Sequence, residues 1–134
     1  MKQPEPNPVE VYLQGLSARN MRTSLEALDL MAQRLTWKTG PKGGKRSYDG
    51  LTAPWWLLTS EEVVEVREQL VGGEWISETT GEPFTPTAVN RFLAALRGVM
   101  RQCWLQGLMP AAAYLDSVTK LKSVSPVPSR AARD

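Results

Sequence analysis

The 134-residue chain contains no histidine and a single cysteine, Cys103. Without histidine, neither a Ser-His nor a Cys-His nucleophile pair can be assembled. One thiolate is also too few for the usual zinc sites. The run Gly-Pro-Lys-Gly-Gly-Lys at residues 40–45 fits neither the Walker nor the dinucleotide-binding spacing, so a glycine-rich phosphate loop is lacking. We therefore expect no catalysis by these residues alone, and no metal, cofactor or small-molecule substrate.

Long apolar runs are missing as well. No stretch approaches the ~20 apolar residues that span a bilayer. The opening residues 1–8 hold three prolines and no apolar segment of the kind that secretory signals contain. A lone cysteine excludes an internal disulfide and fits a reducing compartment. These absences predict a cytoplasmic protein that does not bind a membrane.

Acidic residues are absent from residues 85–108, which form the longest stretch with one clear helical period. The expected boundaries are Thr85 as N-cap, Pro86 at the first helical position and Gly107 as a left-handed stop. The apolar side chains recur at the spacing that places them on one side of a helix. They are Val89, Phe92, Leu93, Leu96, Val99, Met100, Cys103 and Trp104.

Away from this apolar stripe, Asn90, Arg97 and Arg101 project together from the predicted helix, and Arg91 lies nearer its opposite shoulder. One interpretation is an ordinary solvated surface. An exposed helix, however, usually interleaves Glu with its Arg at i,i+4 spacing, and this one does not. The small residues Thr87, Ala94 and Gly98 would let the helix approach a phosphate backbone closely. The pattern therefore also fits a polyanion-binding face.

Charge is distributed unevenly along the chain, although the formal net charge is only +2. Residues 1–50 hold eight Lys/Arg against five Asp/Glu, and residues 84–134 hold seven against two. Residues 51–83, between them, hold one against seven. This asymmetry predicts a basic surface that the first and last helices build together.

A short helix over residues 9–16 and a longer one over residues 17–35 are expected before the middle of the chain. Ser17 is the predicted N-cap of the longer helix. Arg19 and Arg22 fall in its first turn, where cations oppose the helix dipole. They are either tolerated surface charges or ligands for a phosphate bound at this helix start.

Residues 39–50 are rich in Gly and Lys and predict a mobile basic loop. Its cations Lys42, Lys45 and Arg46 could close on a polyanion or merely keep the loop soluble. In the densest aromatic run, we assign Trp55 or Trp56 to the interior, because aromatics in helical chains are more often core than base-stacking platforms.

The second half of the chain should add two further helices to the one at residues 85–108. Residues 60–71 predict a helix with acids in its first turn, as the dipole prefers. Residues 75–84 predict a short irregular hairpin or an extended loop, and residues 110–122 a last helix. The expected fold is an all-α bundle of four to five helices.

Several of these stretches together resemble the N-terminal core-binding (SAM-like) domain of tyrosine recombinases, the phage-integrase type. Residues 85–109 are similar to the family's pattern of a Ser/Thr-capped helix that reads Thr, Asn-Arg and Leu-x-Ala-Leu-Arg before a Gly turn. The run Ser-Ala-Arg-Asn-Met-Arg at residues 17–22 looks like the family's first DNA-facing helix. The resemblance implies a leader at residues 1–6, a core-binding domain at 7–122 and, at 123–134, a linker to a catalytic domain absent from this chain.

By this resemblance, the chain binds double-stranded DNA at a recombination site, beside other recombinase protomers, and is not itself an enzyme. The helices that begin at residues 17 and 85 would face the major groove. The implied DNA-binding residues, mostly phosphate contacts that set position, are Arg19, Arg22, Thr87, Arg91, Arg97 and Arg101. The alternative is a helical protein-interaction module that assembles recombinase protomers through the Trp-rich middle of the chain.

Overall fold

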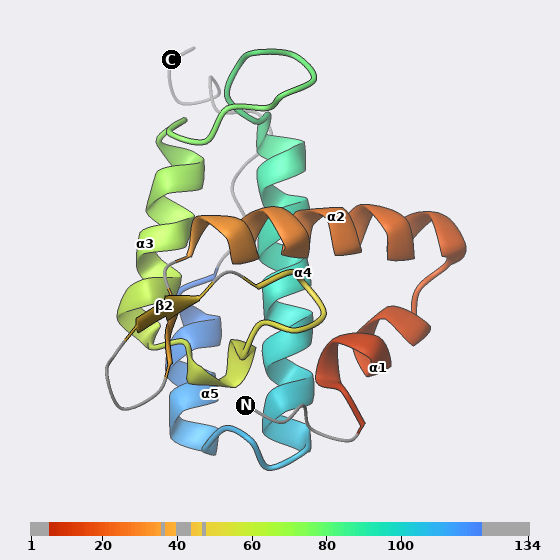
Figure 1. The fold of residues 1–134 in the computed structure, drawn as a ribbon, viewed down its shortest axis with the longest axis vertical. Helices are drawn as coiled ribbons and strands as arrows, with labels where there is room; N and C mark the ends of the chain where they lie inside the picture. The colour runs from red at the N-terminus through yellow and green to blue at the C-terminus, as the bar shows by residue number, and fades with distance from the viewer. Residues whose placement is uncertain (1–5, 36, 40–43, 47, 122–134) are drawn as a thin grey trace, which may run out of the picture.

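The computed structural model describes residues 6–35, 37–39, 44–46 and 48–121. Over these residues the chain is an all-α bundle of five helices, as the sequence predicts (Figure 1). The helices are α1 (Pro8–Gln14), α2 (Ala18–Arg34), α3 (Ser60–Val71), α4 (Pro86–Leu105) and α5 (Ala111–Thr119). A single 3₁₀ turn, η1 (Trp55–Leu57), precedes α3. The predicted linker and nearly all of the predicted leader lie outside the described residues.

Side-chain caps fix where four of these helices begin. The caps of α1, α2, α3 and α4 are Asn7, Ser17, Thr59 and Thr85, each of which accepts a hydrogen bond from a backbone N–H two or three residues later. In α3 the Glu62 side chain also accepts from the Thr59 N–H, which completes a capping box. Each cap satisfies a donor that the helix itself leaves without a partner, so the sequence specifies these boundaries locally.

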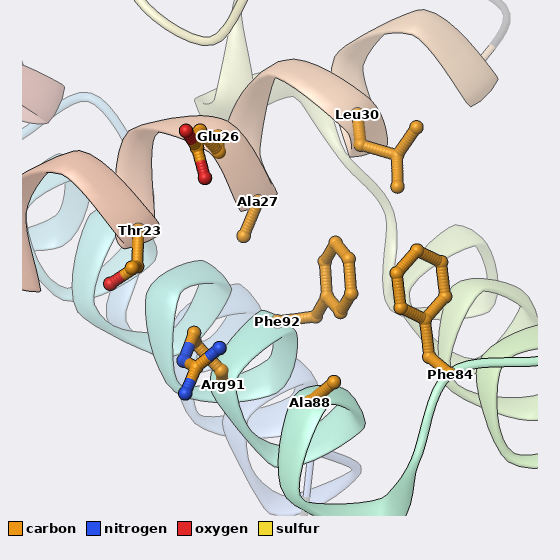
Figure 2. A pocket seen from close by; sticks show the side chains of 8 residues that line it. All are labelled: Thr23, Glu26, Ala27, Leu30, Phe84, Ala88, Arg91 and Phe92. Carbon is orange, nitrogen blue, oxygen red and sulfur yellow. The ribbon is translucent and has the colours of Figure 1, made fainter. Parts of the chain in front are cut away.

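Helix α2 crosses α4 near the middle of the molecule, and its N-terminal half extends past α4 on the side away from α3 (Figure 1). A pocket remains open where the two helices diverge, beside Phe92 (Figure 2). The Asp29 carboxylate of α2 accepts a 2.6 Å hydrogen bond from the Gly50 N–H, which ties α2 to the segment that leads to η1.

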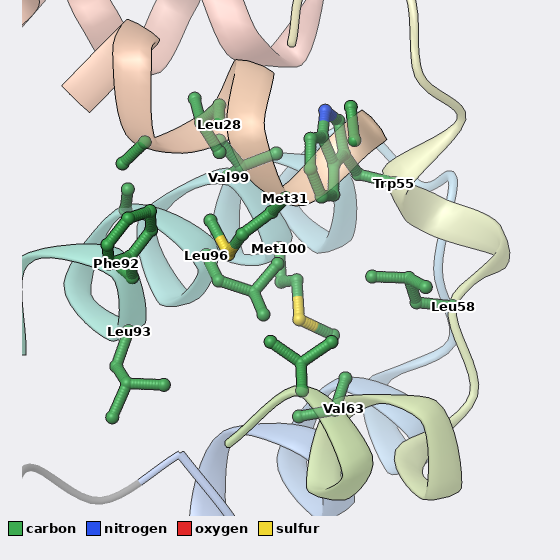
Figure 3. Packing of buried hydrophobic residues seen from close by; sticks show 14 of the residues in the cluster. Leu28, Met31, Trp55, Leu58, Val63, Phe92, Leu93, Leu96, Val99 and Met100 are labelled. Atoms are coloured by element: carbon green, nitrogen blue, oxygen red, sulfur yellow. The ribbon is translucent and has the colours of Figure 1, made fainter. Parts of the chain in front are cut away.

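The core lies between α4 and its neighbours (Figure 3). Leu96, Val99, Met100 and Cys103 of α4 are fully buried, as the periodicity of this helix predicts. Trp55 is also fully buried, and its indole N–H donates to the Gly50 carbonyl at 2.9 Å, so the interior position predicted for one of the two tryptophans is confirmed. Each buried aliphatic side chain here contributes about 1.5–3 kcal/mol to folding.

Helix α1 packs against α4 at Gly98, the one glycine of α4. A Cβ built on Gly98 would lie 2.1 Å from Cε1 of Tyr12. The Tyr12 ring therefore occupies the space above Gly98, and the sequence-based interpretation of Gly98 as room for a phosphate backbone is wrong. The absent side chain serves the contact between two helices instead.

Residues 39–50 are not a loop throughout. Strand β1 (Trp37–Thr39) pairs antiparallel with β2 (Gly44–Arg46), with Lys38 opposite Lys45. The Gly- and Pro-rich sequence predicts a loop here. The strand pairing was missed because the extended segments of a hairpin can be very short. For residues 75–84, where the sequence predicts a short irregular hairpin or an extended loop, the structure shows a single antiparallel bridge between Ile76 and Pro83, with Gly81 at a positive φ of 74° between them.

Candidate nucleic-acid interface

Helices α2 and α4 carry five exposed arginines, and one of them, Arg34, lies with its guanidinium group over the ring of Trp75. The other four are Arg19 and Arg22, in the first turns of α2, and Arg91 and Arg101, on the outer side of α4. All four residues are exposed, and within the described ranges none of their guanidinium groups makes a hydrogen bond or an ion pair. Their charges are therefore available to a ligand. We name these four residues the cationic face.

Arg97 does not belong to this face, although the sequence groups it with Asn90 and Arg101. Its guanidinium donates a hydrogen bond to the backbone carbonyl of Leu121, 24 residues later, and the residue is half-buried. Leu121 itself is fully buried just after α5. The prediction that the Arg97 cation is left free for a polyanion is therefore wrong, because this side of α4 is covered by the C-terminal end of the fold.

The other predicted contact residues divide by position. Thr87 is exposed beside the cationic face, whereas Asn90 is half-buried. Lys42 lies outside the described residues. Lys45 and Arg46 lie on β2, where the structure describes their backbone pairing with β1 alone. Among the described residues, Arg19 and Arg22 on α2 and Arg91 and Arg101 on α4 are thus exposed and have no hydrogen bond or ion pair through their guanidinium groups.

The N-terminus of α2 supports the same cationic face. Ser17 caps the helix through the Asn20 N–H at 3.3 Å, and the first turn contains no acidic residue. Two arginines in this turn oppose the helix dipole. An anion bound at the helix start would reverse that cost, since the exposed N–H groups and both guanidinium groups would then face the same negative charge.

One residue of the cationic face, Arg91, lines the pocket between α2 and α4 (Figure 2). The pocket encloses about 190 Å³. Its apolar lining is Ala27 and Leu30 from α2, Ala88 and Phe92 from α4, and Phe84 from the preceding loop. The polar residues that line it are Thr23, Glu26 and Arg91. Phe84 and Phe92 contact each other edge to face, with ring centroids 4.9 Å apart.

Sequence reasoning missed Thr23 and Glu26. Both follow Arg19 on one stripe of α2, at i+4 and i+7, so a helical projection of α2 could have placed the three together. Nothing in the sequence says, however, which element this stripe faces. Only the crossing of α2 over α4 brings Glu26 to the same pocket as Arg91.

Acidic side chains gather on α3 instead. Glu61, Glu65 and Glu68 recur at i, i+4 and i+7, and all three are exposed. They line one broad groove of α3 together with Glu62. Helix α3 lies on the far side of α4 from the N-terminal end of α2 (Figure 1). The uneven charge along the sequence therefore places exposed acids on α3 and exposed arginines on α2 and α4.

Three features of the described residues bear on nucleophilic chemistry, metal binding and membrane spanning. Cys103 is fully buried, and burial raises the pKa of its thiol to about 12, so almost no thiolate forms at neutral pH. Within the part of the chain that the structure describes, no three His, Cys, Asp or Glu side chains gather into a possible metal site. No helix there is both long and apolar enough to cross a membrane.

Comparison with known proteins gives no relative: no family model, curated protein or solved structure matches this chain. The geometry of the cationic face is therefore the basis for any assignment of function.

Proposed function

We propose that this chain binds double-stranded DNA through the cationic face, as the N-terminal core-binding domain of a tyrosine recombinase would. In this proposal the domain grips DNA at a recombination site beside other protomers, inside the cell, and leaves cleavage to a separate catalytic domain. The observation that carries the proposal is the set of four exposed guanidinium groups on two crossing helices, which have no partner among the described residues.

Phosphate binding is the chemistry that this arrangement supports best. Guanidinium groups bind phosphate oxygens through paired hydrogen bonds. About ten residues of helix separate Arg91 from Arg101, which corresponds to roughly 15 Å along the axis. The two side chains therefore reach phosphates several nucleotides apart rather than a single one. Such contacts fix the position of the protein on the duplex without reading its sequence.

The acidic stripe of α3 supports the same orientation. Glu61, Glu65 and Glu68 would repel a polyanion that approached α3. A duplex is therefore steered toward the α2–α4 side of the molecule, where the potential is positive. The resemblance of residues 17–22 and 85–109 to the DNA-facing helices of tyrosine recombinases points to the same side.

Fluorescence anisotropy with a labelled duplex of about 30 base pairs tests this proposal. At about 50 mM salt, where phosphate contacts are strong, the chain should bind the duplex and release it as salt is added. A duplex that stays free across the whole protein titration would contradict the proposal.

A second candidate function is a helical protein-interaction module that assembles recombinase protomers. Within the Trp-rich middle, Trp55 and Trp75 are buried and cannot form its contact surface, which leaves the half-buried Trp56 and the exposed Leu57. The corner between α4 and α5 also favours this candidate, since Leu105 and Leu115 are 53% and 59% exposed and residues 102–115 carry no charge. Gel filtration with and without the duplex separates the two functions: self-association without DNA retention would favour this one.

A further inference from the structure

The pocket between α2 and α4 is lined by an acidic residue, Glu26. An acidic residue is not expected on a surface that binds phosphates alone. The carboxylate of Glu26 is exposed and makes no hydrogen bond or ion pair with any described residue. It belongs to the stripe that also carries Arg19, and it lines the same pocket as Arg91 (Figure 2). A carboxylate near a phosphate backbone weakens binding through charge repulsion. Glu26 and Arg91 together give this pocket a hydrogen-bond acceptor and hydrogen-bond donors, which suit a partner that itself has both.

Base edges in the major groove provide such a partner. Arginine donates two hydrogen bonds to O6 and N7 of guanine, and glutamate accepts from the N4 amino group of cytosine. We infer that Arg91 and Glu26 read one G·C base pair from the major groove, Arg91 on the guanine and Glu26 on the cytosine. This inference rests on the proposed function and adds base recognition to its phosphate contacts.

The pocket itself fits this role. Arg91 and Glu26 approach it from different helices, so one base pair can meet both side chains only if α2 and α4 face the groove together. The lining below them is apolar, with Ala27, Ala88 and Phe92. Hydrogen bonds beside an apolar wall lose competing water, and a mismatched base would leave a polar group there without a partner. The free-energy cost of that unpaired polar group is what would discriminate between bases.

Selection from a duplex library with a randomised central segment tests the inference on the full 134-residue chain. The wild-type chain should enrich a G·C pair at one position by on the order of ten-fold, the discrimination of one good side-chain contact to a base. Glu26→Ala should relax that preference, while its binding to the remaining sequences stays equal or becomes tighter. Arg91→Ala should relax the same position and also weaken binding to every sequence.

Glu65→Ala is the matched control, because Glu65 is an exposed helical glutamate on α3, away from the pocket. It should leave the selected sequences unchanged. If Glu26→Ala tightens binding to all sequences equally and changes no preference, Glu26 acts only by repulsion and the inference is wrong, although DNA binding stands. The same holds if the wild-type chain binds duplexes but enriches no sequence. If it binds no duplex at all, the proposed function fails together with the inference.

Discussion

The outer surfaces of α3 and of the α2–α4 pair use the same helical spacing for opposite charges. On α3, Glu61, Glu65 and Glu68 form a stripe, and the one cation of this helix, Arg67, stands at neither i,i+3 nor i,i+4 spacing from any of them. On α4, Arg91 and Arg101 stand on a helix without any acid. The glutamates of α3 and the arginines of α4 have no opposite charge at i,i+4 on their own helix, whereas Glu26 of α2 lies four residues after Arg22. The fold therefore gives up a few tenths of a kcal/mol per like-charged neighbour on both sides.

The two surfaces differ in how their charged groups are used within the fold. Glu62 of α3 completes the capping box with Thr59, so part of the acidic surface has a structural role. The guanidinium groups of the cationic face have no such role among the described residues, because their side chains make no hydrogen bond or ion pair there. Exposed arginines without an internal partner are what the proposed DNA-binding surface requires.

Reversing charge on the cationic face should have the largest effect. The double variant Arg91→Glu with Arg101→Glu replaces two cations of the proposed interface by anions, and we expect duplex affinity to fall on the order of 100-fold at about 50 mM salt. Anisotropy titration measures this, with circular dichroism to show that the helices persist. Unchanged affinity in a folded variant would remove α4 from the interface.

Arg97 and Arg101 form a matched pair that separates stability from binding. Arg97→Gln leaves the buried Leu121 carbonyl without its cationic partner, which should cost about 1–3 kcal/mol in the free energy of unfolding. Arg101→Gln should cost less than about 0.5 kcal/mol because it is a surface change, yet it should weaken DNA binding more than Arg97→Gln does. Urea unfolding measures the stability of each variant, and anisotropy measures its duplex affinity. If Arg97 were the DNA ligand, Arg97→Gln would weaken duplex binding more than Arg101→Gln.

Thr59→Ala tests whether the start of α3 is independent of the cationic face. Loss of the capping box should lower stability by about 1 kcal/mol. Duplex affinity should not change, since α3 lies away from the proposed interface. A fall in affinity at a temperature where the variant is fully folded would show that α3 contributes to binding.

Neutralising the acidic stripe should have the smallest effect. Glu65→Gln with Glu68→Gln removes charges from α3, across α4 from the N-terminal end of α2 (Figure 1), and physiological salt screens such charges with a Debye length of about 8 Å. We expect duplex affinity to change by less than about two-fold under those conditions. A much tighter complex would mean that the duplex passes close to α3.

Helix boundaries were predictable because their causes are local. In α4 the cap, the proline and the stop are Thr85, Pro86 and Gly107, all within or next to the helix. The buried stripe followed from a period of 3.6 residues. For the same reason the acids of α3 were expected in its first turn, where Glu61 and Glu62 lie.

The exact composition of the cationic face was not predictable, because it depends on contacts distant in sequence. A helical projection puts Arg97 beside Arg101, and only the packing of residues after α5 brings the Leu121 carbonyl to Arg97. Likewise Gly98 looks like open surface until Tyr12 of α1 is placed above it. Long-range packing decides which polar positions of an amphipathic helix remain exposed.

The salt dependence of duplex binding tests the central claim most directly. If Arg19, Arg22 and Arg101 each neutralise one phosphate while Arg91 binds a base, the logarithm of the association constant should fall with the logarithm of salt concentration at a slope of about −2.7, at roughly −0.9 per phosphate contact. Arg101→Gln should reduce the steepness by about 0.9, and Arg97→Gln should leave it unchanged. A slope near zero, or one that responds to Arg97 but not to Arg101, would contradict the assignment of DNA binding to this face.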